Sequence, residues 1–290
     1  MSEVIYDAKA IREILKSNNI RYSKSMGQNF LIDAAIPEKL VRLSGVDRSC
    51  GVLEVGPGLG ALTLELSRSV RHVVAVELDG RLLPVLRKTL ADTSNVEVIH
   101  GDILKLDIAE LVYAKLPDIM RHVCANLPYN ITTPILTAFI QAKAFKTITV
   151  MVQREVARRI CATPGSPDYG AFTVYINYHS EPETLFDIPP ECFVPRPEVY
   201  SSVIKLKIRS ELPLMPEDEA AFFRVVRAAF GQRRKTLVNA LHSVYGNTMQ
   251  KKDIEEIVGK CGLDSHIRGE VLGIEEFMRL SAFFKQKADY

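Results

Sequence analysis

Apolar and polar residues alternate along the middle of the chain in blocks that are typical of strands and helices in turn. Short apolar runs predict strands at residues 51–55, 72–77, 96–100, 122–126 and 147–153. The segments between them carry apolar residues at helical spacing and predict helices at 61–69, 81–91, 108–116 and 134–142. This alternation predicts an α/β fold in which helices cover both faces of a mostly parallel sheet.

The pattern changes after Gly170. Apolar runs at 171–179, 183–188 and 203–208 have no long helical segment between them, which predicts strands at an antiparallel edge of the sheet. A proline-containing linker at 210–216 is followed by predicted helices at 217–230, 235–244, 251–261 and 274–285. We therefore expect two domains, 1–209 and 210–290, the second small and α-helical. Before the sheet, residues 7–18 predict an amphipathic helix and 23–31 a loop.

A glycine-rich turn joins the first predicted strand to the helix that follows it. Residues 54–60 read Glu-Val-Gly-Pro-Gly-Leu-Gly, so Gly56 and Gly58 let the backbone turn tightly and leave space beside the amides of the helix start. This geometry suits a nucleotide-like cofactor. The spacing Gly56-x-Gly58-x-x-Ala61 also satisfies the dinucleotide-binding fingerprint, so a nicotinamide-dependent dehydrogenase stays open at this point.

Two carboxylates end the next two predicted strands. Glu77 lies 21 residues after Gly56, where its side chain can accept hydrogen bonds from a ribose diol. Asp102 ends the following strand and can accept a hydrogen bond from the exocyclic amine of adenine, although it could instead cap the next helix. Because the carboxyl ends of parallel strands share one edge of a sheet, the two residues predict a pocket for an adenosine-containing ligand.

The end of the fourth predicted strand carries Asn126-Leu127-Pro128-Tyr129. An amine on an aromatic ring is a weak nucleophile because its lone pair is delocalised, and two carbonyl acceptors can draw it toward a pyramidal geometry. The Asn126 side chain and a neighbouring main-chain carbonyl could supply them, while Pro128 stiffens the turn and Tyr129 offers a face for an extruded base. A buried asparagine beside a core tyrosine is the alternative. The motif favours methyl transfer to a base amine.

Composition restricts the remaining possibilities. The chain of 290 residues is 47% hydrophobic and 25% charged with a net charge of +2, so any nucleic-acid binding must come from local clusters. Its five cysteines are scattered without a Cys-x-x-Cys pair, which favours a reducing compartment and argues against a disulfide framework or a metal site. We expect a cytoplasmic protein, since neither a leader pattern nor a membrane-length apolar run is evident.

Several motifs in a fixed order make the chain resemble the ribosomal RNA adenine dimethyltransferases that use S-adenosylmethionine. The resemblance spans nearly the whole chain and is closest to the small-subunit branch of that family. Its motifs are Gly27-Gln28-Asn29-Phe30-Leu31, residues 54–60, Gly101-Asp102, Asn126-Leu127-Pro128-Tyr129, residues 152–157, residues 193–201 and residues 230–237. Tyr200 is a mild departure, at a position where relatives often carry a small or acidic residue.

The resemblance implies a Rossmann-like class I methyltransferase with a mostly parallel seven-stranded sheet and a helical second domain. It implies that S-adenosylmethionine is held by Asn29, Leu31, Gly56, Gly58, Glu77, Asp102 and Asn126. It also implies a catalytic set of Asn126, Leu127, Pro128, Tyr129 and Phe193, with the two aromatic rings enclosing the target adenine. Phe193 stands in a loop that Pro195 and Pro197 stiffen. The expected reaction is N6,N6-dimethylation of two adjacent adenines near the 3′ end of 16S rRNA, within a precursor of the small (30S) subunit.

Basic residues that could contact RNA form two groups. One comprises Arg233, Arg234 and Lys235, and the other comprises Arg154 and Arg158 beside Arg159. Phosphate contacts by such residues would make binding strongly salt-dependent, whereas a solvated helix face is the ordinary alternative. We expect a monomer that binds neither membrane nor metal.

Two other functions compete with small-subunit dimethylation. One is a large-subunit (23S) rRNA adenine methylase of the macrolide-resistance type, and the other is an assembly factor that binds the small subunit without needing catalysis. The helical extension carrying Arg233 to Lys235 fits the small-subunit group better, and Glu77, Asp102 and Asn126 argue against lost catalysis. A dehydrogenase lacks an evident acid–base pair for hydride transfer.

Overall fold

The computed structural model describes residues 6–18, 20 and 27–285 of the chain. Within them the protein forms two compact units, one of residues 1–157 and 183–208 and the other of residues 158–182 and 209–290. The first four residues of the predicted 23–31 loop lie outside the described residues. None of the described helices combines the length and apolar character needed to cross a membrane.

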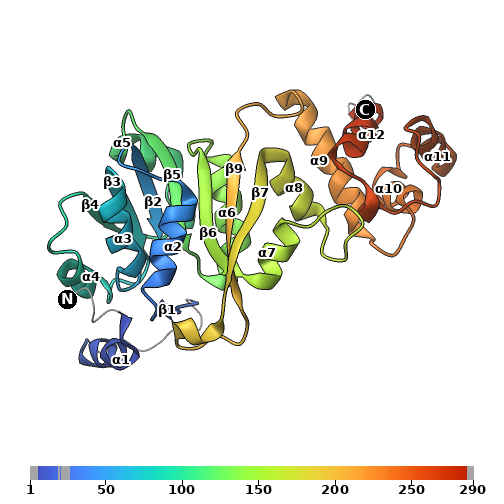
Figure 1. Ribbon diagram of the computed structural model, residues 1–290. Helices are drawn as coiled ribbons and strands as arrows, with labels where there is room; N and C mark the ends of the chain where they lie inside the picture. Colours follow the sequence, from blue (N-terminus) through green and yellow to red (C-terminus); the bar gives the residue numbers. More distant parts are fainter. Residues whose placement is uncertain (1–5, 19, 21–26, 286–290) are drawn as a thin grey trace. The chain divides into compact units, whose positions relative to one another are not determined.

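The first unit is built on a seven-stranded sheet with the order β4-β3-β2-β5-β6-β9-β7 (Figure 1). Strands β2 to β6 pair with one another in parallel, and β9 runs antiparallel to β6. The strands are β2 (Cys50–Val55), β3 (His72–Glu77), β4 (Val96–His100), β5 (Met120–Asn126), β6 (Thr147–Gln153), β7 (Ser180–Ile188) and β9 (Ser201–Ile208). The predicted mostly parallel sheet with an antiparallel edge is therefore confirmed.

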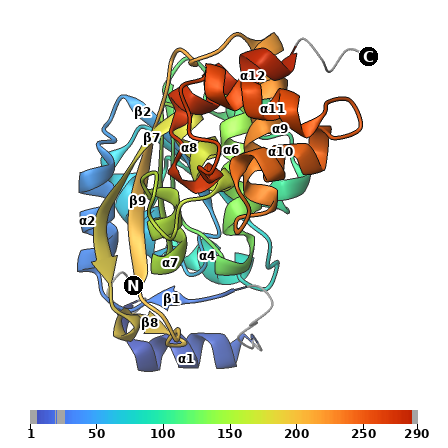
Figure 2. The same cartoon turned by 90° about the vertical axis from the view of Figure 1, so that its right-hand side faces the viewer.

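Helices pack on both faces of this sheet. Leu40 of α2 and Leu66 of α3 share a core cluster with Val52 and Val73 of the central strands, while α6 lies on the opposite face (Figure 2). The helical elements of this unit are α1 (Ala8–Ser17), α2 (Ala35–Ser44), α3 (Ala61–Ser69), α4 (Leu83–Thr89), η3 (Ile103–Lys105), α5 (Ile108–Lys115), η4 (Tyr129–Ile131), α6 (Thr132–Gln141) and η5 (Pro190–Cys192). A two-stranded antiparallel sheet joins β1 (Phe30–Leu31) to β8 (Phe193–Val194).

The second unit is helical. Its helices are α8 (Ala171–His179), α9 (Pro216–Gly231), α10 (Leu237–Tyr245), α11 (Lys251–Lys260), η6 (Gly269–Val271) and α12 (Ile274–Lys285), and α7 (Arg154–Ile160) carries the chain into it. Tyr178, Phe222 and Phe277 lie in its core, which has its own set of buried side chains. Segment 158–182 belongs to this unit by its contacts, whereas the sequence placed it in the first domain.

The prediction of a strand at 171–179 is wrong, because these residues form α8. Aromatic and β-branched side chains give the segment a strand-like composition. However, Val174 and Tyr178 stand four residues apart and both enter the core of the second unit, which is helical spacing. The Thr173 hydroxyl also accepts a hydrogen bond from the Gly170 amide at 3.1 Å and caps the helix start. Packing and capping therefore override the composition.

Candidate active site

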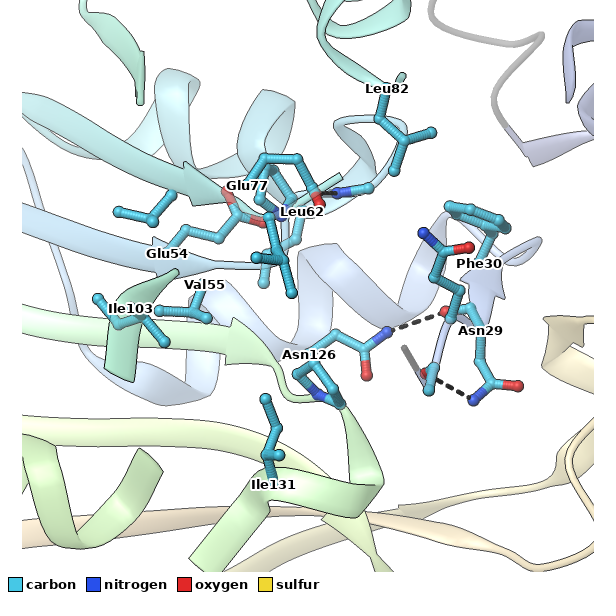
Figure 3. A pocket seen from close by; sticks show the side chains of 18 of the residues that line it. Asn29, Phe30, Glu54, Val55, Leu62, Glu77, Leu82, Ile103, Asn126 and Ile131 are labelled. Carbon is cyan, nitrogen blue, oxygen red and sulfur yellow. Dashed lines mark hydrogen bonds between the residues drawn. The ribbon is translucent and has the colours of Figure 1, made fainter. Parts of the chain in front are cut away.

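A cavity of about 270 Å³ opens at the carboxyl ends of the parallel strands of the first unit (Figure 3). Its walls come from the glycine turn, the ends of β3, β4 and β5, and the 27–31 segment. Every residue predicted to hold the cofactor lines it, namely Asn29, Leu31, Gly56, Gly58, Glu77, Asp102 and Asn126. The structure thus brings together residues that lie up to 97 positions apart in the chain.

The glycine turn requires glycine at its centre. Gly58 has φ of +61°, and a Cβ atom added to it would lie 3.2 Å from the Phe30 ring. The Gly58 amide donates a hydrogen bond to Glu77 at 3.1 Å, and the Asp79 amide donates another at 2.8 Å. Burial raises the pKa of Glu77, which is only 5% exposed, while these two bonds act in the opposite direction. Glu77 therefore fixes the turn as well as facing the cavity.

The 27–31 segment is attached to the strand ends by side chains that belong to no periodic pattern in the sequence. Gln28 donates to Asp79 at 3.0 Å, and Arg81 donates two further hydrogen bonds of 2.8 Å to the same carboxylate. The bonds from Arg81 are the main reason that the pKa of Asp79 is lowered. Asp79 was not among the predicted site residues. Its position two residues after Glu77 and two before Arg81 could have indicated that it pairs with Arg81 beside the end of β3.

Asn126 is held in one orientation. Its amide nitrogen donates to the main-chain carbonyl of Asn29 at 3.2 Å, and Figure 3 shows the side-chain oxygen turned away from that bond. The Asn29 side chain in turn donates to the Gly27 carbonyl at 3.2 Å. Because this bond holds the amide nitrogen, it fixes the position of the side-chain oxygen, the one acceptor of the amide group, at the end of β5.

Asp102 caps the following helical turn, as one of the two interpretations of the sequence expects, and it also lines the cavity, so binding of an adenine amine stays a prediction. One carboxylate oxygen accepts the Leu104 amide at 3.1 Å and caps η3. The other oxygen lies 3.6 Å from the Lys105 ammonium group, and the residue lines the cavity. A carboxylate has several acceptor sites, so a cap does not prevent it from binding a ligand.

Glu54 is a buried carboxyl group in the cavity wall that the prediction did not include among the site residues. It is 1% exposed, and within the described residues its Oε2 atom has no hydrogen-bond partner. Burial raises the pKa of Glu54 to about 8, with Thr63 acting to lower it and the charge of Glu77 raising it further. The cavity therefore holds one carboxyl group that is protonated at neutral pH beside Glu77.

The predicted catalytic residues divide into two sets. Asn126 and Pro128 line the cavity, whereas Leu127, Tyr129 and Phe193 are not among its lining residues. The Tyr129 hydroxyl forms a hydrogen bond of 2.5 Å with the Ser201 hydroxyl. Burial raises the pKa of Tyr129. Phe193 is 1% exposed and pairs with Leu31 across β1 and β8. Base stacking by Tyr129 and Phe193 stays a prediction.

The basic residues also differ in their surroundings. Arg233 donates to the carbonyls of Pro167 and Tyr169 at 2.9 and 3.1 Å, so it braces a loop of the second unit. Arg234 and Lys235 are exposed and form no ion pair with any other described residue, and Arg158 is exposed as well. Arg154 lies over the Tyr200 ring. Their RNA contacts stay predictions. No cluster of three potential metal ligands occurs among the described side chains.

The sheet order, the glycine turn and the acidic end of β3 define a class I methyltransferase. The chain belongs to the ribosomal RNA adenine dimethylase family, whose sequence model matches residues 18–280. Membership implies a methyl donor of the S-adenosylmethionine type and an rRNA substrate.

Three proteins are similar to this chain over most of its length. The ribosomal RNA small subunit methyltransferase A of Geobacillus kaustophilus is 44% identical over 273 residues, which are 93% of each chain. The solved structure of the 23S rRNA methyltransferase ErmE is 26% identical with a TM-score of 0.69, covering 87% of this chain and 98% of that one. A dimethyladenosine transferase from Plasmodium falciparum is 24% identical with a TM-score of 0.74, covering 89% and 98%, and shows the fold alone.

Proposed function

We propose that this protein transfers methyl groups from S-adenosylmethionine to adenine N6 atoms of 16S rRNA, dimethylating two adjacent adenines within a precursor of the small subunit. Identity of 44% to a small-subunit methyltransferase, against 26% to a 23S enzyme, supports this substrate over the large-subunit alternative. The intact set of strand-end residues supports an enzyme over an assembly factor without catalysis. We expect it to act in the cytoplasm as a monomer.

The cavity fits the adenosine part of this donor. Glu77 is the acceptor at the end of β3 where a ribose diol would bind, and Ile103 and Leu62 supply apolar walls for a purine. Asp102 can accept a hydrogen bond from the purine amine while it caps η3. When bound, S-adenosylmethionine supplies an electrophilic methyl group on a sulfonium centre.

The orientation of Asn126 is the observation on which the proposed reaction depends. Its nitrogen is engaged by the Asn29 carbonyl, so its oxygen can accept one hydrogen of the adenine amine, and the main-chain carbonyl of Leu127 can accept the other. Two acceptors localise the lone pair on nitrogen and aim it at the donor. A strong general base is unnecessary, because the methylated ammonium product loses its proton readily to water. Tyr129 and Phe193 would hold the flipped base from its two faces.

Mapping the modified nucleotides tests this function. The protein is incubated with labelled S-adenosylmethionine and small subunits from cells that lack the activity, in parallel with large subunits. We expect label in two adjacent adenines near the 3′ end of 16S rRNA and none in the large subunit. Label confined to the large subunit would support the 23S alternative, and no label in either would refute both.

Replacing Asn126 with alanine tests the mechanism. We expect kcat to fall by about 10²–10³, the usual cost of removing one well-placed hydrogen-bonding group in a reaction centre. Cofactor affinity measured by calorimetry should change little, since the ribose and purine acceptors remain. Glu77→Ala is the matched comparison and should lose cofactor affinity first. Near-normal turnover of Asn126→Ala would exclude its amine-orienting role.

A further inference from the structure

An exposed tyrosine and an arginine lie together where β6 ends and β9 begins. Arg154 follows the last residue of β6 and Tyr200 precedes the first residue of β9, whose Ser201 pairs with Gln153. The Arg154 amide donates to the Tyr200 carbonyl at 2.9 Å, and the guanidinium carbon lies 4.4 Å from the centre of the Tyr200 ring. Tyr200 is nevertheless 41% exposed, and the adjacent Val199 is 45% exposed. The ring is therefore positioned on one side and open to solvent.

This pair belongs to the same edge of the sheet as the methyl-transfer site. Asn126 pairs with Met151 near the carboxyl end of β6, and Gln153 is two residues further along that strand. Tyr200 thus stands two strands from Asn126, roughly 10 Å across the sheet, and three residues, again roughly 10 Å, further along the strand direction. The Tyr129 hydroxyl forms a hydrogen bond with the hydroxyl of Ser201, the neighbour of Tyr200. This bond links the Asn126–Tyr129 motif to the start of β9, where Tyr200 lies.

The charge around the pair favours a base over a phosphate as its ligand. Arg154 forms no ion pair with another described residue, but its charge lies over the aromatic ring. Glu155 and Glu198 are exposed neighbours in the sequence, and Arg196 is paired with Glu191 at 3.5 Å. Among these residues, all of the first unit, positive and negative charges are therefore balanced, in contrast to Arg234 and Lys235, while Arg158 and Arg159 belong to the second unit. An aromatic face with balanced charge is suited to stacking of an unpaired base.

We infer that Tyr200, positioned by Arg154, is the stacking platform for an RNA base that flanks the target adenine. The inference deepens the proposed function and depends on it. Arg154 covers one face of the ring, so the flanking base stacks on the other. Holding that neighbour keeps the RNA strand splayed while the adenine is turned toward Asn126, and stacking is tolerant of base identity.

Steady-state methylation of small subunits tests this platform. We expect Tyr200→Ala to raise KM for the particle roughly tenfold, within the range found for base-stacking aromatics, with kcat changed less than about twofold. Tyr200→Phe should retain the wild-type KM because it keeps the ring. Since stacking involves no phosphate, the ratio of the KM of Tyr200→Ala to the KM of the wild type should stay constant as the salt concentration is raised.

Tyr113 provides a matched control. Tyr113 is 51% exposed, and the guanidinium carbon of Arg121 lies 4.1 Å from the centre of its ring, so the two residues form the same kind of pair. Arg121, however, is near the start of β5, whereas Asn126 is at its end. Tyr113→Ala should leave KM unchanged. A Tyr200→Ala variant with wild-type KM, or a Tyr200→Phe variant as impaired as Tyr200→Ala, would overturn the inference. Absence of turnover by the unaltered protein would instead refute the proposed function and the inference with it.

Discussion

Replacing Glu54 with glutamine is expected to remove a pH dependence of folding that the buried carboxyl imposes. Burial raises the pKa of Glu54 from 4.5 to about 8. The unfolded chain therefore releases this proton above pH 4.5, while the folded protein keeps it until about pH 8. Unfolding releases a proton throughout that interval, so the free energy of unfolding decreases as pH rises through it.

His122 contributes in the opposite direction over part of the same range. Burial and the charges of Lys146 and Lys205 lower its pKa from 6.5 to about 4. Between these two pH values His122 is therefore protonated in the unfolded chain and neutral in the folded protein. Its contribution to stability is complete above pH 6.5 and decreases toward pH 4. The two slopes therefore oppose each other between pH 4.5 and 6.5. From pH 6.5 to 8 the stability lost through Glu54 is no longer offset by His122, and the loss over this interval amounts to about 2 kcal/mol.

Urea denaturation at pH 6.5 and pH 8 measures this difference. The wild-type free energy of unfolding should decrease by about 2 kcal/mol between the two values, and that of Glu54→Gln should stay level. Glu97→Gln, which removes a half-exposed carboxylate from β4, controls for the change in net charge. Equal slopes for the wild type and Glu54→Gln would show that Glu54 is ionised in the folded protein, contrary to its burial.

Two further predictions address the cofactor turn and the RNA contacts. Gly58→Ala should lower the free energy of unfolding by roughly 1–2 kcal/mol because of its positive φ, and should weaken cofactor binding by calorimetry because its Cβ meets Phe30. Gly165→Ala, with φ of +84° and nothing within 4 Å, should cost similar stability but leave cofactor affinity intact; equal affinity of both variants would contradict the role of the turn. Arg234→Glu together with Lys235→Glu should flatten the log–log salt dependence of particle binding by about 0.7–0.9 per lost phosphate contact, whereas Lys252→Glu on α11 should not. An unchanged slope would assign Arg234 and Lys235 to an ordinary solvated face.

The sheet and its strand-end residues could be predicted from sequence because they follow local rules. Apolar runs predicted β3 and β6 to the residue, since strands buried inside such a sheet are largely apolar, and they also predicted the half-buried edge strand β4 to the residue. Once the strands are known, Glu77, Asp102 and Asn126 follow, because strand ends meet at one edge. Residues 171–179 failed because the composition of the segment and its packing favour different structures.

The 27–31 segment could not be predicted in this way. Asn29 and Leu31 belong to no periodic element, and only the family resemblance indicated them. Their position depends on long-range contacts: β1 pairs with β8 more than 160 residues later, and Gln28 reaches Asp79 across 51 residues. A local pattern contains no information about such partners. The same holds for Arg233, whose role as a brace depends on a loop 64 to 66 residues earlier.

Residues that stabilise the fold and residues that line the cavity are not separate sets in this site. Glu77 accepts the Gly58 and Asp79 amides, and Asp102 accepts the Leu104 amide, while both line the cavity. Removing either carboxylate therefore leaves backbone amides of the cavity wall without an acceptor and also removes the proposed ligand contact. Glu77→Gln retains one acceptor oxygen, which can serve one of the two backbone amides, since Gly58 and Asp79 donate to different carboxylate oxygens. Its free energy of unfolding and its cofactor affinity, measured beside those of Glu77→Ala, therefore separate the two effects: affinity that recovers together with stability belongs to the turn, and affinity that stays lost while stability recovers belongs to the ligand.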